Sequence, residues 1–158
     1  MEFVEDVILA QSDTTAGFFS YDAKKLNTIK NSPPNKPLLQ VSPSLKALNP
    51  RVPLQHKALA RRTKATLVCR NSQAWRVIQD PLTLNYLERL GVIFSTSANR
   101  SAQPYDYQIA FGLAQIIIED RRGLYASQPS QIFKLSKTRK KTPTLNYLCF
   151  LGGVLKPC

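Results

Sequence analysis

The chain has 158 residues, of which 43% are apolar and 20% charged, a composition typical of one globular domain rather than of a disordered chain. Its formal net charge is +12, and the excess lies in one stretch: residues 23–79 hold twelve Lys and Arg and no acid, whereas residues 1–22 hold five acids and no base. This imbalance favours an anionic partner. The longest mostly apolar run, residues 145–155, is shorter than the ~18 residues that cross a bilayer, so we expect a cytoplasmic protein without a membrane partner.

Strand and helix patterns are short and alternate along the chain. Strands are predicted over residues 3–9, 17–21, 37–41, 65–69, 74–78, 92–94, 116–118 and 131–135. Helices are predicted after four capping residues, with a further short helix over residues 57–62; the caps are Asp22, Ser42, Asp80 and Asp106. The pattern indicates an α/β or α+β domain with a mixed sheet over residues 1–141, followed by a tail, residues 142–158, of unassigned role.

Several common catalytic arrangements are absent from the sequence. The cysteines Cys69, Cys149 and Cys158 form no C-x-x-C pair, which argues against a zinc site or a disulfide framework and favours a reducing compartment. The single histidine, His56, has no acid or nucleophile beside it and is predicted to be a solvated surface residue. Neither common glycine-rich phosphate loop occurs, so a nucleotide site must be built in another way. No metal-binding residue is predicted.

Four segments place small polar residues, or lysines beside prolines, where predicted strands end: residues 11–17, 29–38, 95–101 and 128–132. Such a cluster is usually a turn, but ligands of α/β sheets also sit at strand ends. In the second segment, prolines stiffen a loop that carries Lys30 and Lys36. A stiff loop holds its cations in place before a ligand binds.

Taken together, the four segments resemble the YrdC/Sua5 family of L-threonylcarbamoyladenylate synthases. The family motif P-T-D-T-x-Y-G-L is matched at Asp13, Thr14 and Gly17. The motif I-K-x-R-P-x-x-K-P-L is matched at Ile29, Lys30, Pro33, Lys36, Pro37 and Leu38. Residues 96–101 reproduce T-S-A-N-x-S-G without its last glycine, and order and spacing agree along residues 4–135. The resemblance implies a YrdC-like single domain with a twisted mixed sheet, flanked by helices around a basic cleft.

The resemblance also implies an activity. Members of the family condense L-threonine, bicarbonate and ATP, with Mg²⁺ on the phosphates, to threonylcarbamoyl-AMP and pyrophosphate. The product serves the N6-threonylcarbamoyladenosine (t6A) modification of tRNA, which adds tRNA and the downstream threonylcarbamoyl-transfer machinery as expected partners. Such a site gathers anionic reactants and holds them in line, which is work that basic residues can do.

Individual residues receive roles from the same resemblance. It implies catalytic roles for Lys30, Ser97 and Asn99, and it implies that Thr14 and Asp13 line the L-threonine pocket. The residues implied to bind the nucleotide are Lys30, Lys36, Thr96, Ser97, Asn99, Ser130 and Arg76.

The sequence departs from the family pattern at one charged position. Ser32 stands where the family has the arginine of K-x-R, and a hydroxyl cannot replace a charged bidentate group. Another base then takes over, with Arg62, Lys64, Arg100 and Lys36 as the candidates, or the protein is an altered member. Three alternatives to the synthase stay open. The protein is a non-catalytic RNA- or nucleotide-binding module of the same fold, or an enzyme that uses another amino acid, or a protein whose positive charge only keeps its surface soluble.

Overall fold

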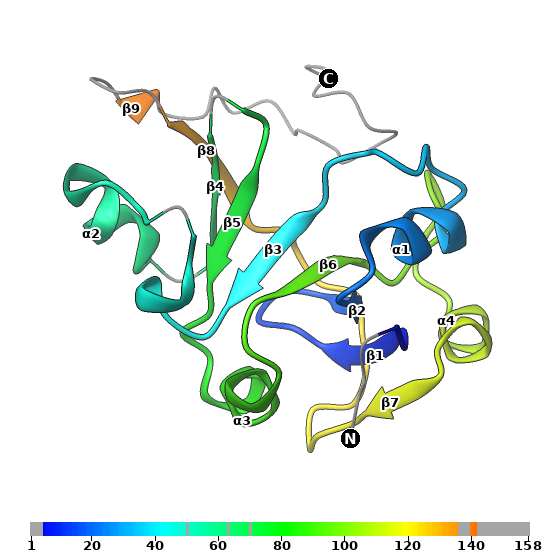
Figure 1. Cartoon of the computed structure of the whole chain (residues 1–158). Coiled ribbons are helices and arrows are strands. Elements are labelled where there is room, and N and C mark those ends of the chain that lie inside the picture. The colour runs from blue at the N-terminus through cyan, green and yellow to red at the C-terminus, as the bar shows by residue number, and fades with distance from the viewer. Residues whose placement is uncertain (1–4, 50, 63, 70, 136–139, 142–158) are drawn as a thin grey trace.

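The computed structural model describes residues 5–49, 51–62, 64–69, 71–135 and 140–141, so the expectations for the apolar run 145–155 and the tail 142–158 lie outside the described residues. Within that part of the chain, nine strands form one sheet in the order β7-β1-β2-β6-β3-β5-β4-β8-β9 (Figure 1). The strands are β1 (Ile8–Gln11), β2 (Ala16–Ser20), β3 (Leu39–Ser42), β4 (Ala65–Val68), β5 (Ala74–Val77), β6 (Ile93–Ser97), β7 (Ile116–Ile118), β8 (Gln131–Leu135) and β9 (Lys140–Lys141). The pairs β1–β7, β3–β5 and β4–β8 are parallel and the other neighbours are antiparallel, which confirms the predicted mixed sheet.

Three of the four α-helices in the described part of the chain begin at an aspartate cap that the sequence predicts. They are α1 (Ala23–Ile29), α2 (Lys57–Ala60), α3 (Pro81–Leu90) and α4 (Tyr107–Leu113), with 3-10 turns η1 (Leu45–Ala47) and η2 (Leu54–His56). The carboxylates of Asp22, Asp80 and Asp106 each accept a hydrogen bond from a backbone N–H of the first turn that follows. These bonds satisfy N–H groups that a helix start otherwise leaves open, so the three predicted starts are confirmed.

Two local predictions are wrong, and both were overturned by packing. No α-helix follows Ser42: β3 runs through it, its hydroxyl donates to Ser44 O at 2.7 Å, and only η1 follows. His56 is not solvated but 3% exposed: it lies where η2 meets α2, and α2 packs against β4. The first strand also differs from the predicted range 3–9. It begins at Ile8 and continues to Gln11, and all four of its residues pair with β2.

The sheet is covered on both faces. Phe18 and Phe19 are neighbours in β2 and point to opposite faces, each 1% exposed. Phe18 lies in the apolar cluster that α1 and α4 cover, whereas Phe19 packs with Tyr86 and Leu87 of α3. A third cluster, around Trp75 of β5, packs under α2. The polar segments at the strand ends are thereby held on a rigid sheet.

Candidate active site

Lys30 joins two segments that are far apart in the sequence. It caps the C-terminus of α1, and its side chain crosses to the end of β6 and the turn that follows. Its ammonium Nζ donates to Ser97 O at 2.9 Å, to Asn99 Oδ1 at 3.3 Å and to the Asn99 carbonyl oxygen, with Ser97 Oγ at 3.5 Å. The hydroxyl of Ser101 donates back to Lys30 O at 3.0 Å. The fold thus brings the three residues with expected catalytic roles into one cluster.

The environment of Lys30 lowers the pKa of its ammonium group. Burial, and after it the nearby charge of Lys36, lower the pKa of Lys30 from 10.5 to about 8. Burial also lowers the pKa of Lys36, whose Nζ lies 3.5 Å from Ser32 Oγ. Two ammonium groups that repel each other form a site that an anion would stabilise.

Asn27 holds the loop that carries Lys36. Its side chain is completely buried, and its Nδ2 donates to Pro34 O at 3.1 Å and to Lys36 O at 3.0 Å. The Ser32 amide in turn donates to Asn27 O at 2.8 Å. The proline-rich loop is therefore anchored to α1 as well as stiffened by its own composition. Asn27 lies inside the predicted helix, and its sequence context does not mark it as a loop anchor.

The register of β6 decides which of its polar residues reach Lys30. Ser97 pairs with Gly17, and Thr96 pairs with Phe18. Because neighbours in a strand point to opposite faces, Thr96 is directed away from the face of Ser97 and toward the face of Phe18. The structure therefore places Ser97, but not Thr96, beside the Lys30 ammonium.

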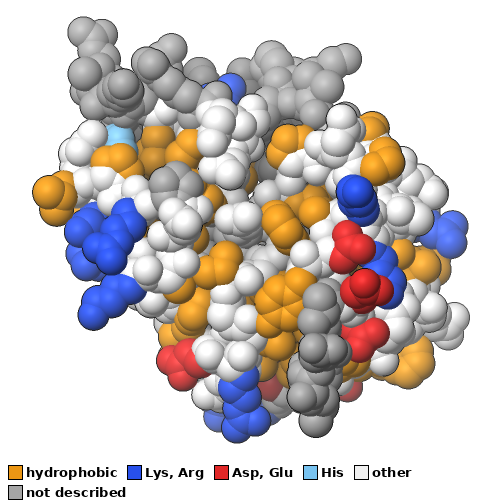
Figure 2. Space-filling view, viewed as in Figure 1, with side chains coloured by type: hydrophobic (Ala, Val, Ile, Leu, Met, Phe, Trp, Pro, Cys, Tyr) orange, Lys and Arg blue, Asp and Glu red, His pale blue; other side chains and the backbone are white. Residues whose placement is uncertain are grey.

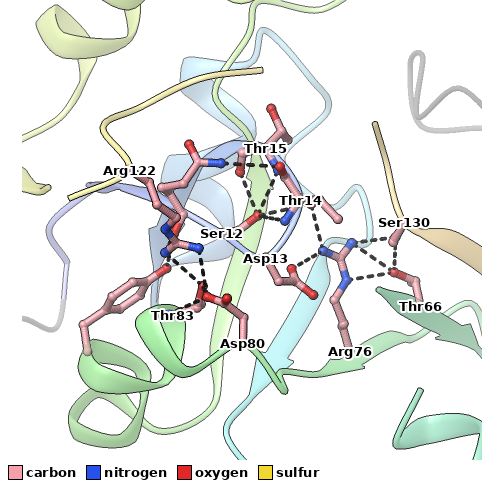
Figure 3. Close-up of polar contacts among 12 residues, drawn as sticks. Ser12, Asp13, Thr14, Thr15, Thr66, Arg76, Asp80, Thr83, Arg122 and Ser130 are labelled. Atoms are coloured by element: carbon pink, nitrogen blue, oxygen red, sulfur yellow. Dashed lines mark hydrogen bonds and ion pairs between the residues drawn. The ribbon is translucent and has the colours of Figure 1, made fainter. Parts of the chain in front are cut away.

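A second polar cluster surrounds Arg76 of β5, on the right in Figure 3. Arg76 is 7% exposed and forms an ion pair with Asp13, with Nη1 and Oδ1 3.0 Å apart. Nη1 also donates to Thr14 Oγ1 at 3.1 Å, Nε and Nη2 donate to Thr66 Oγ1, and Nη2 donates to Ser130 Oγ at 2.7 Å. An arginine has five N–H groups, and these contacts engage all of them.

Residues 12–15, which connect β1 to β2, form a closed turn, called here the 12–15 loop. Ser12 Oγ donates to Thr15 O at 2.7 Å and accepts from the backbone N–H groups of Thr14 and Thr15. A serine hydroxyl has one hydrogen, so the contact of 3.1 Å between Ser12 Oγ and Thr14 Oγ1 is donated by Thr14. Thr14 and Asp13 are 5% and 9% exposed. Arg76 holds both side chains in place through its hydrogen bonds to them.

The two clusters lie at the same end of the β1–β2–β6 part of the sheet. The 12–15 loop leads into Ala16, whose carbonyl oxygen accepts from the Ala98 N–H at 2.9 Å, and Gly17 pairs with Ser97. The expected L-threonine residues and the expected catalytic residues are thus linked by backbone hydrogen bonds. The expected basic cleft around them stays a prediction.

Of the four bases considered as substitutes for the missing arginine, Lys36 is the one that the described residues show in contact with Ser32. Arg62, Lys64 and Arg100 are exposed. Figure 2 shows a group of Lys and Arg side chains on the left of the molecule, over α2, where Arg61 and Arg62 follow the helix. That group of charges lies apart from the Lys30 contacts and faces solvent.

Some residues of the site region carry no mark in the sequence. Thr66 is a single polar residue inside an apolar run, which is a weak signal. Arg122 belongs to a charged segment after β7 whose composition is typical of an exposed turn. It nevertheless forms ion pairs with Asp80 at 2.8 Å and with Asp120 at 2.6 Å. Only the order of the strands brings Arg122 next to the 12–15 loop.

The architecture defines the class of protein: a mixed sheet of this topology, with polar loops at one end, is the YrdC/Sua5 fold. No protein-family model matches the sequence, and no curated protein matches it either. Solved structures do match. P. abyssi Sua5 complexed with L-threonine has a TM-score of 0.69 and 21% identity, over 87% of this chain and 50% of Sua5. E. coli YciO has a TM-score of 0.62 and 16% identity, over 87% of this chain and 82% of YciO.

A third match is full-length HypF in its phosphate- and nucleotide-bound form, with a TM-score of 0.64 and 11% identity over 85% of this chain and 26% of HypF. At these identities the likeness establishes the fold. The chain spans half the length of the Sua5 structure. No helix in the described part of the chain is long and apolar enough to cross a membrane, and the same part contains no group of three or more His, Cys, Asp or Glu side chains placed to hold a metal ion.

Proposed function

We propose that the protein is an L-threonylcarbamoyladenylate synthase, which converts L-threonine, bicarbonate and ATP to threonylcarbamoyl-AMP and pyrophosphate for t6A modification of tRNA. The observation that carries the proposal is the convergence of Lys30, Ser97 and Asn99, with the Lys30 ammonium held by oxygens of the other two residues. A solved structure of the same fold contains L-threonine, which supports an amino-acid site in this architecture.

In the first step, the amine of L-threonine attacks the carbon of bicarbonate and water leaves, which gives a carbamate. Thr14 and Asp13 line the amino-acid pocket in this proposal. Arg76 acts through them, since its N–H groups are all engaged by protein oxygens and it holds the Thr14 hydroxyl in one orientation.

In the second step, a carbamate oxygen attacks the α-phosphate of ATP and the pyrophosphate leaves. Little covalent work falls to the protein, which must align the anions and stabilise the charge that develops. Lys30 and Lys36 bind the phosphate oxygens, and Ser97 and Asn99 orient the acyl group and the nucleotide. Mg²⁺ enters with ATP, because this ion binds mainly to phosphate oxygens and water in such sites. Ser130 lies on the nucleotide side, held by Arg76.

Lys36 supplies the second positive charge that Ser32 cannot. Its Nζ lies beside Ser32 Oγ, and its charge acts on Lys30. A lysine provides a point charge rather than the planar fork of an arginine, so this substitution retains charge and loses bidentate geometry. The transfer machinery that uses the product, and tRNA itself, are the partners that this activity implies.

The test is pyrophosphate release by the purified protein with ATP, bicarbonate and L-threonine. We expect Lys30→Ala and Asn99→Ala to lower kcat at least about a hundredfold, as the loss of one stabilising group in the transition state does. Lys24→Ala is the matched control, because Lys24 is an exposed lysine of the same helix. Wild-type protein that releases no threonine-dependent pyrophosphate would contradict the proposal. An amino-acid panel in the same assay identifies a different substrate.

A second candidate is a non-catalytic RNA- or nucleotide-binding module. The observation that favours it is the run of exposed bases that follows α2 in the sequence, Arg61, Arg62 and Lys64, together with the loss of the K-x-R arginine. This module would bind RNA with an affinity that falls steeply with salt and would release no pyrophosphate.

A further inference from the structure

Arg122 joins three parts of the chain beside the 12–15 loop, as the left side of Figure 3 shows. Its Nη1 donates to Asp80 Oδ2 at 2.8 Å, and Asp80 caps the first turn of α3. Its Nε and Nη2 donate to both carboxylate oxygens of Asp120, at 3.0 and 2.6 Å, which is a bidentate pair. Its Nη2 also lies 3.5 Å from Gln11 O. A single side chain therefore connects α3, the segment after β7 and the last residue of β1.

Gln11 transmits this contact to the 12–15 loop. It is 1% exposed, and its carbonyl oxygen accepts from Tyr86 Oη at 3.0 Å as well as from Arg122. Its side chain donates from Nε2 to Thr14 O at 3.3 Å and accepts from the Tyr125 N–H at 2.9 Å. Gln11 is therefore hydrogen-bonded to α3, to the segment that contains Arg122 and Tyr125, and to the 12–15 loop.

The segment after β7 also holds the far end of the loop. The Tyr125 carbonyl oxygen accepts from the Ala16 N–H at 2.9 Å, and Thr15 Oγ1 lies 3.5 Å from it. The Arg122 N–H donates to Asp120 Oδ1 at 2.9 Å, which fixes the turn that presents Tyr125. The 12–15 loop is consequently held between Gln11 at its start and Tyr125 at its end; Arg122 contacts the first and lies three residues before the second.

Electrostatics make Arg122 hard to replace. Its hydrogen bonds to Asp120 are the main reason that the pKa of that carboxyl is lowered. For Asp80, burial raises the pKa, but hydrogen bonds from Thr83 and the charge of Arg122 outweigh burial and the pKa is lowered. Without Arg122, the carboxylates of Asp80 and Asp120 would lose the cation that they share.

We propose that Arg122 is a positioning residue for the amino-acid pocket: through Gln11 and Tyr125 it fixes the 12–15 loop, and so the orientation of Thr14. This inference rests on the proposed function for the identity of the pocket, but its mechanical part concerns the loop alone. Arg76 holds the loop from the sheet, and Arg122 holds it from the opposite side (Figure 3). Neither arginine needs to touch the substrate for this effect.

The experiment compares Arg122→Gln with Arg121→Gln. Arg121 is the exposed neighbour of Arg122, so the variant Arg121→Gln removes the same charge from the same turn. For Arg122→Gln we expect KM for L-threonine to rise about tenfold, with KM for ATP changed less than about twofold, because a displaced Thr14 weakens binding of one substrate only. Arg121→Gln should match the wild type in both constants. Equal changes in both KM values, or a loss of kcat alone, would overturn the positioning role.

A second variant guards against a general loss of stability. Tyr86→Phe keeps the ring, which packs edge-on against Phe19, and removes only the hydroxyl that donates to Gln11 O. We expect a smaller rise in KM for L-threonine, about two- to threefold, with an unchanged KM for ATP. An unchanged KM for L-threonine in this variant, together with an Arg122→Gln protein that does not fold, would contradict the proposal.

Amide hydrogen exchange separates failure of this inference from failure of the proposed function. The N–H groups of Ser12, Thr14 and Thr15 are hydrogen-bonded within the loop, so their exchange reports on it directly. If the wild type neither binds L-threonine nor releases pyrophosphate, the proposed function fails, and faster exchange in Arg122→Gln than in Arg121→Gln still supports the hold on the loop. Equal exchange in the two variants overturns it.

Discussion

The two buried cations of the site, Lys30 and Arg76, differ in what they can still do for a ligand. Arg76 has a carboxylate partner, and its N–H groups are all engaged by protein oxygens. Among the described residues, Lys30 has only neutral acceptors around its ammonium, with a second ammonium nearby. An anion therefore gains most from Lys30, whereas Arg76 is suited to holding the residues around it.

Nucleotide binding should take up protons near pH 8.5. The pKa of Lys30 is lowered to about 8, so Lys30 is partly neutral there in the free protein, and a bound phosphate raises its pKa again. The contribution of Lys30 should be largest between the lowered pKa and the ordinary value of 10.5, and this contribution should vanish at about pH 6, where Lys30 is charged in both states. Calorimetric titrations with ATP in buffers of different ionisation enthalpy measure it.

The control for this experiment is Lys30→Arg, since an arginine stays charged throughout this range. That variant should bind ATP without the uptake at pH 8.5. Uptake of the same size in Lys30→Arg would mean that another group takes up the proton.

Among the elements, β2 and β6 approach each other closely at Gly17, which pairs with Ser97. A Cβ on Gly17 would lie 3.1 Å from Thr96 O, which is backbone and cannot rotate away. The Lys30 ammonium binds the Ser97 carbonyl oxygen one residue further on. Any widening between the two strands would therefore move the acceptors of Lys30.

Gly17→Ala should lower the free energy of unfolding by about 1–3 kcal/mol, as overpacking does, and should lower pyrophosphate release in the folded fraction. Urea denaturation and the pyrophosphate assay measure the two effects. Gly112→Ala is the control: a Cβ there meets nothing within 4 Å, and alanine favours a helix more than glycine does. A Gly17→Ala protein as stable and as active as the wild type would show that β6 does not need this contact.

At the scale of the molecule, two groups of basic residues in the described part of the chain have different surroundings. Lys30 is buried at the end of the sheet and Lys36 is half-buried beside it, whereas Arg61, Arg62 and Lys64 are exposed beside α2. Exposed charges act on a polyanion through counterion release, and buried ones act on a ligand that fits between them. The net charge of +12 is thus not a property of one surface.

The combined variant Arg61→Gln, Arg62→Gln, Lys64→Gln should weaken RNA binding without changing pyrophosphate release. If all three side chains contact phosphates of a single strand, the slope of log affinity against log salt should become about two units shallower. Fluorescence anisotropy with tRNA at several salt concentrations measures this slope. A wild type that binds no RNA at low salt would leave these charges with a solubilising role.

Local chemistry determined much of this protein from the sequence alone. The caps Asp22, Asp80 and Asp106 act on the next three residues, so three helix starts are readable without the fold. Strands with strong apolar patterns are readable for the same reason, and their alternation with helices indicates the mixed sheet. The motifs around Lys30 and Asn99 also single out one candidate site, but only in combination with the other two segments, because each cluster alone is typical of an ordinary turn.

Tertiary structure decided everything that depends on distant partners. Ser42 ends a strand because it pairs with Val77 of β5, and His56 is buried where α2 packs against β4. Strand order places Arg76 of β5 under the 12–15 loop and brings Arg122 to its other side. The lowered pKa of Lys30 likewise follows mainly from burial, which only the fold decides, although the Lys36 charge that adds to it lies in the same sequence motif. Such contacts join residues that are far apart in the sequence, and the periodicity of the side chains does not predict which of these residues meet.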